Sequence, residues 1–360
     1  MDQATHGSSL ASDPDHDAPV LVLIPTFNDW DALAEVLPRL DAALASQGMV
    51  ADILVVDDAS VVDASPALVR APFRALRRLE ILTLRRNLGH QRAIAIGLAY
   101  AQDRLNHEAV VVMDGDGEDD PNDVPRLLER LHSERGQKIV FAERTRRSET
   151  FIFRLFYRLY KLIHYALIGQ RVRVGNFSAI PRRRLNSLVV VAELWNHYAA
   201  ATFRSRQPFC TIPTRRAKRL RGRSSMNFVG LVTHGLSAIS VYGDIVGVRL
   251  LALSVVLALL SLTGIIAVVV VRFATHWAIP GWATLAAGLS LILLTHAIMM
   301  AFVFSFVILG SRHNLTFLPS RDYGIFVGGV RTFPQDDRAA IRATASGTGF
   351  TPSGGANDNA

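Results

Sequence analysis

Two long stretches without a charged side chain dominate the hydropathy pattern of the chain. Leu250 to Val271 and Ala283 to Gly310 contain no Asp, Glu, Lys or Arg. At about 1.5 Å per helical residue the first stretch would span roughly 33 Å, which is close to the thickness of one hydrocarbon core. A buried helix of that length in a soluble protein usually shows a polar stripe, and neither stretch does. The pattern therefore predicts membrane helices at residues 245–271 and 283–310.

Charge on either side of these stretches predicts their orientation. The loop from Arg272 to Trp282 carries one arginine, whereas the opposite flanks carry many basic residues. These are Arg215, Arg216, Lys218, Arg219, Arg221 and Arg223 before the first stretch, and Arg312, Arg321 and Arg331 after the second. Because basic loops stay in the cytoplasm, we expect a multi-pass protein of the cell inner membrane with both termini cytoplasmic.

From Pro19 to Ala142 short apolar segments alternate with segments of helical spacing. The expected strands are Val20–Ile24, Asp52–Val56, Leu79–Leu84, Ala109–Met113 and Lys138–Ala142. The expected helices are Trp30–Ala45, Gln91–Leu105 and Asp123–Ser133. Strands separated by helices predict an α/β domain with a parallel, doubly wound sheet. Ligands bind such sheets beyond the carboxyl ends of the strands, and every strand expected here ends in polar residues.

The densest group of polar residues follows the fourth expected strand. Asp114, Asp116, Glu118 and Asp119 stand within six positions and would repel one another unless a cation neutralised them. Oxygen ligands of this kind suit Mg²⁺ or Mn²⁺. A calcium loop is disfavoured, because Pro125 stands where an EF-hand needs its last glutamate and the loop follows a strand. A solvated acidic turn without metal is the other alternative.

Several classes of protein are disfavoured by what the sequence lacks. Neither Gly-x-Gly-x-x-Gly nor Gly-x-x-x-x-Gly-Lys follows the first strand, which argues against dinucleotide binding and a P-loop. The single cysteine, Cys210, excludes an intrachain disulfide and a cysteine-rich zinc site. The net charge of +8 favours anionic partners.

Two amphipathic segments predict contact with the bilayer surface. Thr150–Leu167 combines aromatic and aliphatic residues with basic ones, which is typical of an interfacial helix, although a buried core helix is the alternative. Met226–Tyr242 is expected to be a second interfacial helix. The basic residues Arg144, Arg154, Arg158 and Arg219 could bind a lipid phosphate. Their position near the membrane segments argues against nucleic acid as the partner.

Four short motifs occur together and in a characteristic order. They are Pro25-Thr-Phe-Asn-Asp29, Val55-Val-Asp-Asp-Ala-Ser60, Arg86-Asn-Leu-Gly89 and Asp114-Gly-Asp-Gly-Glu-Asp-Asp-Pro121. With the membrane topology and Arg219-Leu-Arg-Gly-Arg-Ser224, residues 19–315 resemble family-2 glycosyltransferases of the Rossmann-like GT-A fold. The resemblance is strongest to polyisoprenyl-phosphate glycosyltransferases, a group that includes dolichol-phosphate mannosyltransferase and bacterial undecaprenyl-phosphate glucosyltransferases.

This resemblance implies an inverting transfer of one sugar from a UDP- or GDP-linked donor to a polyprenyl (undecaprenyl) phosphate. The implied nucleoside contacts are Pro25, Phe27, Asp29 and Asp58, with Asp57 supporting their loop and Asn87 nearby. Asp114, Asp116 and Glu118 would bind Mg²⁺ or Mn²⁺ and the diphosphate, and Asp116 and Asn176 would be catalytic. Arg144, Arg154, Arg158, Arg219 and Ser224 would contact the acceptor phosphate.

The chain departs from the family pattern at three positions. Asn176 stands where relatives commonly have an aspartate, Ser225 where a lysine is frequent, and His90 where a lysine is frequent. An asparagine cannot act as a base. A phosphate acceptor, with a second pKa near about 6, is largely ionised at neutral pH and needs little general-base help. Asn176 therefore favours a phosphate acceptor over a sugar hydroxyl.

The domain organisation and two alternatives complete the expectation. We expect disorder at residues 1–18, a catalytic domain at 19–225, an interfacial helix at 226–243, and a cytoplasmic tail at 311–360 that is disordered after about 342. A processive polysaccharide synthase is disfavoured, since the sequence lacks Gln-x-x-Arg-Trp. A non-catalytic membrane partner is kept open by Asn176 and Ser225. Glycine and alanine in the membrane helices would permit a homo-oligomer.

Overall fold

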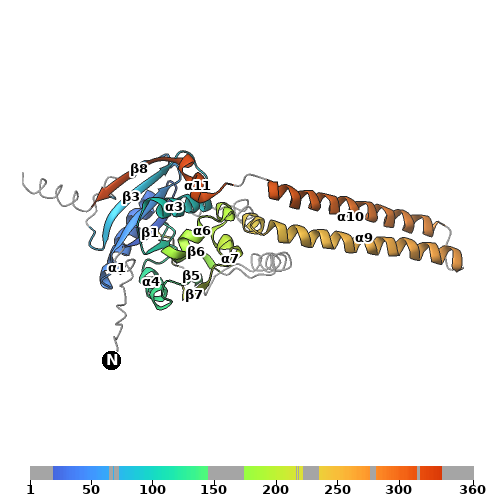
Figure 1. Cartoon of the computed structure of the whole chain (residues 1–360), viewed down its shortest axis with the longest axis horizontal. Helices are drawn as coiled ribbons and strands as arrows, with labels where there is room; N and C mark the ends of the chain where they lie inside the picture. The colour runs from blue at the N-terminus through green and yellow to red at the C-terminus, as the bar shows by residue number, and fades with distance from the viewer. Residues whose placement is uncertain are drawn as a thin grey trace, which may run out of the picture. The chain divides into compact units, whose positions relative to one another are not determined.

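The computed structural model describes residues 19–64, 68, 73–144, 174–215, 217, 219–221, 235–275, 281–313 and 317–334. These residues fall into two compact units. The first unit contains a β-sheet with helices on both of its faces. The second contains two long helices that lie side by side (Figure 1).

The sheet of the first unit has eight strands in the order β7-β5-β6-β4-β1-β2-β3-β8. The strands are β1 (Val20–Thr26), β2 (Ala51–Asp57), β3 (Leu76–Leu84), β4 (Ala109–Val112), β5 (Ile139–Arg144), β6 (Val174–Pro181), β7 (Phe209–Thr214) and β8 (Val327–Pro334). The five strands expected from the sequence are β1 to β5, and all five are present. The expected α/β sheet is therefore confirmed.

The sheet is mixed, because two of the strands that the sequence pattern did not reveal run in the opposite direction. β1 pairs in parallel with β2 and β4, and β2 with β3, whereas β6 is antiparallel to both β4 and β5. β7 is parallel to β5, and β8 is antiparallel to β3. β6 is inserted between two strands that share a direction, so it brings its own start to the edge where they end.

Helices cover both faces, because successive side chains of the central strands point to opposite sides. Val22 and Ile24 of β1 face a core built with α1 (Trp30–Ser46) and α4 (Asp123–Ser133). Leu21 and Leu23 face α3 (His90–Arg104), α6 (Arg182–Leu188) and α7 (Tyr198–Arg204). A short 3₁₀ helix, η1 (Ala192–Trp195), adds to the second face. A central strand buried on both sides explains the unbroken apolar runs of the sequence.

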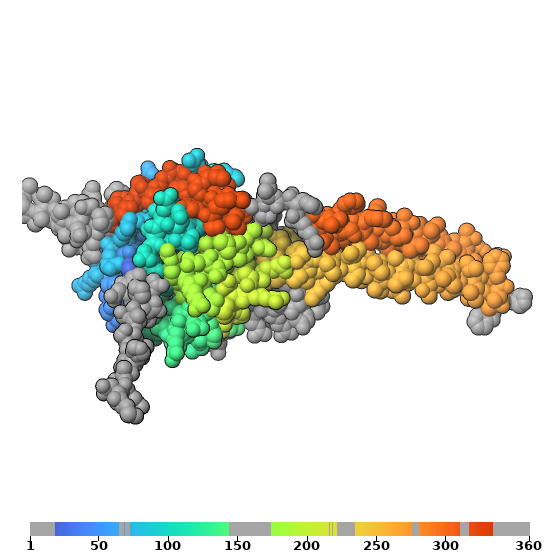
Figure 2. Space-filling model, viewed as in Figure 1, coloured from blue at the N-terminus to red at the C-terminus, as the bar shows by residue number. Residues whose placement is uncertain are grey.

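The last strand belongs to the sheet although its sequence gives little sign of it. β8 contains two adjacent glycines and few apolar residues, yet Leu82 of β3 pairs with Val330. The preceding turns, α11 (Pro319–Asp322) and η2 (Tyr323–Phe326), bring Tyr323 edge-to-face against Tyr100 of α3. Figure 2 shows this C-terminal segment in red on the surface of the first unit. Residues 327–334, expected in a tail, thus complete the sheet of the first unit.

The second unit consists mainly of α9 (Gly243–Ala274) and α10 (Trp282–His313), which pack against each other. Both are long and apolar enough to cross a membrane, and most of their side chains are exposed. They contain the expected membrane segments 245–271 and 283–310. Of the two expected interfacial helices, residues 150–167 lie outside the described residues. Of the other, 226–243, residues 235–240 are helical.

Gly97 provides a test of how closely α3 packs on the sheet. A Cβ atom at this position would lie 2.6 Å from Val56 Cγ2 and 2.7 Å from Leu23 Cδ1. Alanine favours a helix over glycine by about 1 kcal/mol, but crowding a close-packed core costs about 1–3 kcal/mol. We expect Gly97→Ala to lower the thermal unfolding midpoint of the detergent-purified protein, measured by tryptophan fluorescence. Gly324→Ala is the control, because nothing lies within 4 Å of its added Cβ. An unchanged or higher midpoint for Gly97→Ala would contradict this packing.

Candidate active site

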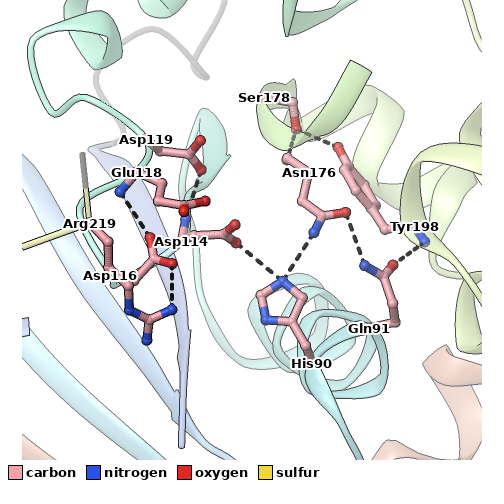
Figure 3. Close-up of polar contacts among 10 residues, drawn as sticks. All are labelled: His90, Gln91, Asp114, Asp116, Glu118, Asp119, Asn176, Ser178, Tyr198 and Arg219. Atoms are coloured by element: carbon pink, nitrogen blue, oxygen red, sulfur yellow. Dashed lines mark hydrogen bonds and ion pairs between the residues drawn. The ribbon is translucent and has the colours of Figure 1, made fainter. Parts of the chain in front are cut away.

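Polar residues from separate parts of the chain meet at the edge of the sheet where β1, β2 and β4 end. The loops after these strands meet the start of β6, the start of α3 and the segment that follows β7. Figure 3 shows the central part of this group, from Asp116 and Arg219 to Asn176 and Tyr198. This is the edge at which a doubly wound sheet binds its ligands.

The loops after β1 and β2 are joined by hydrogen bonds. The Asn28 N–H donates to Ser60 Oγ at 2.9 Å, and the Val61 N–H donates to Asn28 Oδ1 at 2.9 Å. Asp57 Oδ1 accepts the Ser60 N–H at 2.9 Å, which holds the same loop. Phe27 remains 46% exposed beside this joined pair of loops. These hydrogen bonds hold the two loops in place, and the exposed ring of Phe27 beside them can contact a ligand.

Asp58 organises the turn before α3. Its carboxylate is buried and accepts the Leu88 N–H at 2.7 Å and the Gly89 N–H at 2.8 Å. Burial raises the pKa of Asp58 and outweighs the lowering by these two N–H groups. The contact of Asp58 to the nucleoside that the resemblance implies stays a prediction. Each oxygen of Asp58 accepts one backbone N–H, which holds the turn that carries the exposed Asn87 and leads to His90 at the start of α3.

The turn after β4 is held by its own carboxylates. Asp119 is buried and accepts the Asp114 N–H at 3.0 Å, and Asp116 Oδ1 accepts the Glu118 N–H at 2.9 Å. Asp114, Asp116 and Glu118 are partly exposed. Burial raises the pKa of Asp116, and the charges of Asp114 and Glu118 raise it further, against the lowering by Arg219. The turn therefore concentrates negative charge that favours a cation.

In this structure the cation beside Asp116 is Arg219. Its Nη1 lies 3.2 Å from Asp116 Oδ2 and its Nη2 lies 2.6 Å from Asp29 Oδ2. The three side chains are between 18% and 25% exposed. Arg219 was expected on an acceptor phosphate, and here it joins the end of β1 to the turn after β4.

His90 lies on the other side of the carboxylates and contacts Asn176. His90 Nε2 is 3.1 Å from Asp114 Oδ1 and 3.0 Å from Asn176 Nδ2. Burial lowers the pKa of His90, but Asp114, Asp119 and Asp116 raise it by more, so the net pKa is raised. Two of the positions at which the chain departs from its family pattern, His90 and Asn176, are thus neighbours 86 residues apart in sequence.

Gln91 fixes the orientation of the Asn176 amide. The Tyr198 N–H can only donate, and it lies 2.8 Å from Gln91 Oε1. Gln91 Nε2 therefore donates to Asn176 Oδ1 at 3.1 Å, which turns the Asn176 amino group toward His90 (Figure 3). Sequence reasoning missed Gln91 because nothing in its local pattern distinguishes it from a surface residue of α3.

The carboxylate oxygens of the turn are ligands that suit Mg²⁺ or Mn²⁺. These ions bind carboxylate oxygens and complete their coordination shell with water and substrate phosphate. Among the residues that the structure describes, no three His, Cys, Asp or Glu side chains are arranged to hold a metal ion. In the structure Asp114 faces His90, Asp116 faces Arg219 and Asp119 accepts a backbone N–H. Magnesium commonly uses only one or two protein carboxylates, so the residues remain suited to the ion.

The expected acceptor-side residues lie mostly outside the described residues. Arg154, Arg158 and Ser224 fall there, as does the side chain of Arg144 at the end of β5. Of the acceptor-side residues named from the sequence, the structure describes only the side chain of Arg219.

Two curated proteins similar to this chain share one name. Undecaprenyl-phosphate 4-deoxy-4-formamido-L-arabinose transferase from Edwardsiella ictaluri is 27% identical over 75% of this chain and 82% of its own length. The protein of the same name from Klebsiella pneumoniae is 25% identical over 73% of this chain and 80% of its own length.

Solved structures similar to this chain include two glycosyl-3-phosphoglycerate synthases. Mannosyl-3-phosphoglycerate synthase from Rubrobacter xylanophilus is 14% identical over 62% of this chain and 72% of its own, with a TM-score of 0.46. Glucosyl-3-phosphoglycerate synthase from Mycobacterium tuberculosis, in complex with Mn²⁺, UDP-glucose and phosphoglyceric acid, is 16% identical over 64% of this chain and 80% of its own, with a TM-score of 0.45.

The family comparison covers most of the sheet and its edge. Residues 21–189 match the model of the family described as Glycosyl transferase family 2. This range includes the loops after β1, β2 and β4, the start of α3 and Asn176. The mixed sheet with its Rossmann-like core is accordingly a GT-A fold, followed by two apolar helices that could span a membrane. The chain therefore contains a glycosyl transferase family 2 domain, and it is a glycosyltransferase.

Proposed function

We propose that this glycosyltransferase moves one sugar from a nucleoside-diphosphate sugar to a polyprenyl phosphate, with inversion at the anomeric carbon. The observation that carries the proposal is the position of the carboxylate turn after β4. It stands beside the fixed loops after β1 and β2, in a chain with two helices apolar enough to cross a membrane. The donor is UDP- or GDP-linked, and the acceptor is undecaprenyl phosphate.

On the donor side, Phe27 and Asp29 supply an aromatic face and a hydrogen-bond acceptor for the nucleoside. Pro25 and Asp58 are further nucleoside contacts, and Asp57 supports them by accepting the Ser60 N–H in the loop after β2. Asp114, Asp116 and Glu118 would hold Mg²⁺ or Mn²⁺ with the diphosphate. Such an ion supplies neutralisation of the charge that develops on the leaving nucleoside diphosphate.

On the acceptor side, Asn176 supports a phosphate. Its amide points its amino group toward His90 and cannot remove a proton. A phosphate that is already ionised needs no base, whereas a sugar hydroxyl does. The relatives named undecaprenyl-phosphate transferases support the same class of acceptor.

The membrane helices would hold the catalytic domain at the surface where the acceptor lies. The connection between α9 and α10 contains no arginine or lysine and Arg272 lies in the last turn of α9, whereas many basic residues stand on the opposite flanks. By the positive-inside rule, the catalytic domain and both termini lie on the cytoplasmic side of the inner membrane. Cytoplasmic nucleotide sugars are then accessible to the site.

The activity is tested with membranes that contain the full-length protein. We expect label from a radioactive UDP- or GDP-sugar to enter a chloroform-soluble, acid-labile product when undecaprenyl phosphate and Mn²⁺ or Mg²⁺ are present. No such product from any donor in a broad screen would overturn the proposal and favour a non-catalytic membrane partner. A polymer in place of a single-sugar lipid would indicate a processive synthase.

The role of Asp116 is tested by Asp116→Asn. Losing a carboxylate that binds the metal and diphosphate should reduce transfer about 100-fold or more. Asp120→Asn on the same turn is the control, because Asp120 Oδ1 accepts the Asn122 N–H and does not face Arg219 or His90. Addition of EDTA should stop wild-type transfer, and Mn²⁺ should restore it. Equal activity of the two variants would contradict the assignment of Asp116.

The absence of a base is tested by Asn176→Asp. If the acceptor is an ionised phosphate, a carboxylate here gives no gain in rate and adds repulsion beside Asp114. We expect transfer to stay equal or fall, by about tenfold at most. Asn186→Asp, on the exposed side of α6, controls for the added charge. An increase above about tenfold for Asn176→Asp would mean that the reaction does use a base at this position.

A further inference from the structure

We propose that Arg219 is a tethered cation that competes with the divalent metal for Asp116, so that donor binding releases it from the carboxylate turn. The inference rests on the proposed function, because it assumes that Asp116 takes part in metal binding. It concerns the segment formed by residues 217 and 219–221, which follows β7.

The first observation is that this segment is fastened to the turn after β4 through its backbone as well as its side chain. The Ala217 N–H donates to the Glu118 carbonyl at 3.0 Å, and the Leu220 N–H donates to the Asp116 carbonyl at 3.0 Å. Gly117 lies between these two carbonyls and has a φ of +82°. A change in the conformation of the turn would therefore move this segment directly.

The approach at Gly117 is close enough to exclude any larger residue. An added Cβ there would lie 2.5 Å from Leu220 Cγ and 2.7 Å from Leu220 Cδ1. Leu220 also packs against the core formed with α1 and α4. A shift of the turn on binding a ligand would therefore press on Leu220 and on the guanidinium next to it.

The second observation is which oxygen Arg219 occupies. Asp116 Oδ1 accepts the Glu118 N–H, so Oδ2 is the oxygen directed away from the turn, and Arg219 Nη1 lies on it. A divalent ion bound to Oδ2 would stand within a few ångströms of the guanidinium. At about 4 Å, charges of like sign repel by several kcal/mol at the effective dielectric constant of a protein surface. The two cations therefore cannot share this oxygen.

The third observation is that the same guanidinium holds Asp29. Arg219 Nη2 lies 2.6 Å from Asp29 Oδ2, at the end of β1 where the nucleoside is proposed to bind. Arg219 would leave Asp116 and Asp29 in one movement, because its one rigid guanidinium makes both contacts. Metal and nucleoside would thus each weaken the attachment of Arg219, and by linkage its attachment weakens the binding of both.

Release would leave an arginine beside a newly bound diphosphate with no carboxylate to neutralise it. Arginine binds phosphate oxygens in a bidentate manner. Arg219 would then be available to an acceptor phosphate only after the donor is in place.

The test is Mn²⁺ binding to the full-length, detergent-purified protein without nucleotide, measured by isothermal titration calorimetry. Arg219→Gln removes the competing cation, and we expect Mn²⁺ to bind roughly three- to tenfold more tightly. Arg221→Gln is the matched control. It removes the same charge two residues away, where Arg221 is 60% exposed and paired with Glu35. Arg219→Lys keeps the charge and should bind Mn²⁺ close to the wild-type affinity.

Each outcome decides the inference. Tighter Mn²⁺ binding confined to Arg219→Gln supports it, as does binding by Arg219→Gln when the wild type takes up no Mn²⁺. Unchanged or weaker binding by Arg219→Gln, equal tightening in Arg221→Gln, or no binding by any variant up to millimolar Mn²⁺ would overturn it. The proposed sugar transfer is judged separately by the lipid product, so tethering can fail while transfer stands.

Discussion

The arrangement of the site depends on the balance of charge at the turn after β4. Three partly exposed carboxylates, Asp114, Asp116 and Glu118, stand at the end of one buried strand, and their repulsion must be offset by a cation. In this structure Arg219 lies on Asp116 and His90 lies on Asp114. Each of these groups comes from a different element. The charge balance therefore ties the segment after β7 and the start of α3 to the turn, and it determines which oxygens face a ligand.

The sheet topology makes this balance achievable. β6 runs antiparallel between β4 and β5, and Val112 pairs with Ser178, so the residues before Ser178 project past the end of β4. Asn176 reaches the carboxylate edge for this reason. β7 is parallel to β5, so its carboxyl end delivers Arg219 to the same edge. In a wholly parallel sheet the start of β6 would lie at the opposite edge, whereas the carboxyl end of β7 would stay at this one.

The polar network from Asp114 to Tyr198 joins two positions that the family resemblance singled out. The resemblance leads us to expect a lysine at position 90 and an aspartate at position 176, and the structure brings the His90 and Asn176 side chains to 3.0 Å. The Tyr198 N–H fixes Gln91, and Gln91 fixes the Asn176 amide. The two side chains therefore belong to one hydrogen-bonded network. Position 176 contributes an amide to this network, next to the carboxylates that follow β4.

The sequence by itself determined the features that depend on local pattern. Residue spacing and charge predict the five apolar strands, the three helices between them, the two long apolar helices and the carboxylates after β4. The structure contains each of these features. Only the tertiary structure decided the reversal of β6, the addition of β8 from 327–334 at the sheet edge, and the pairing of Arg219 with Asp29. These features join residues up to about 250 positions apart, and their energies come from contacts made after folding. The local sequence pattern does not predict these features, because strand order and ion pairing depend on which surfaces meet in space.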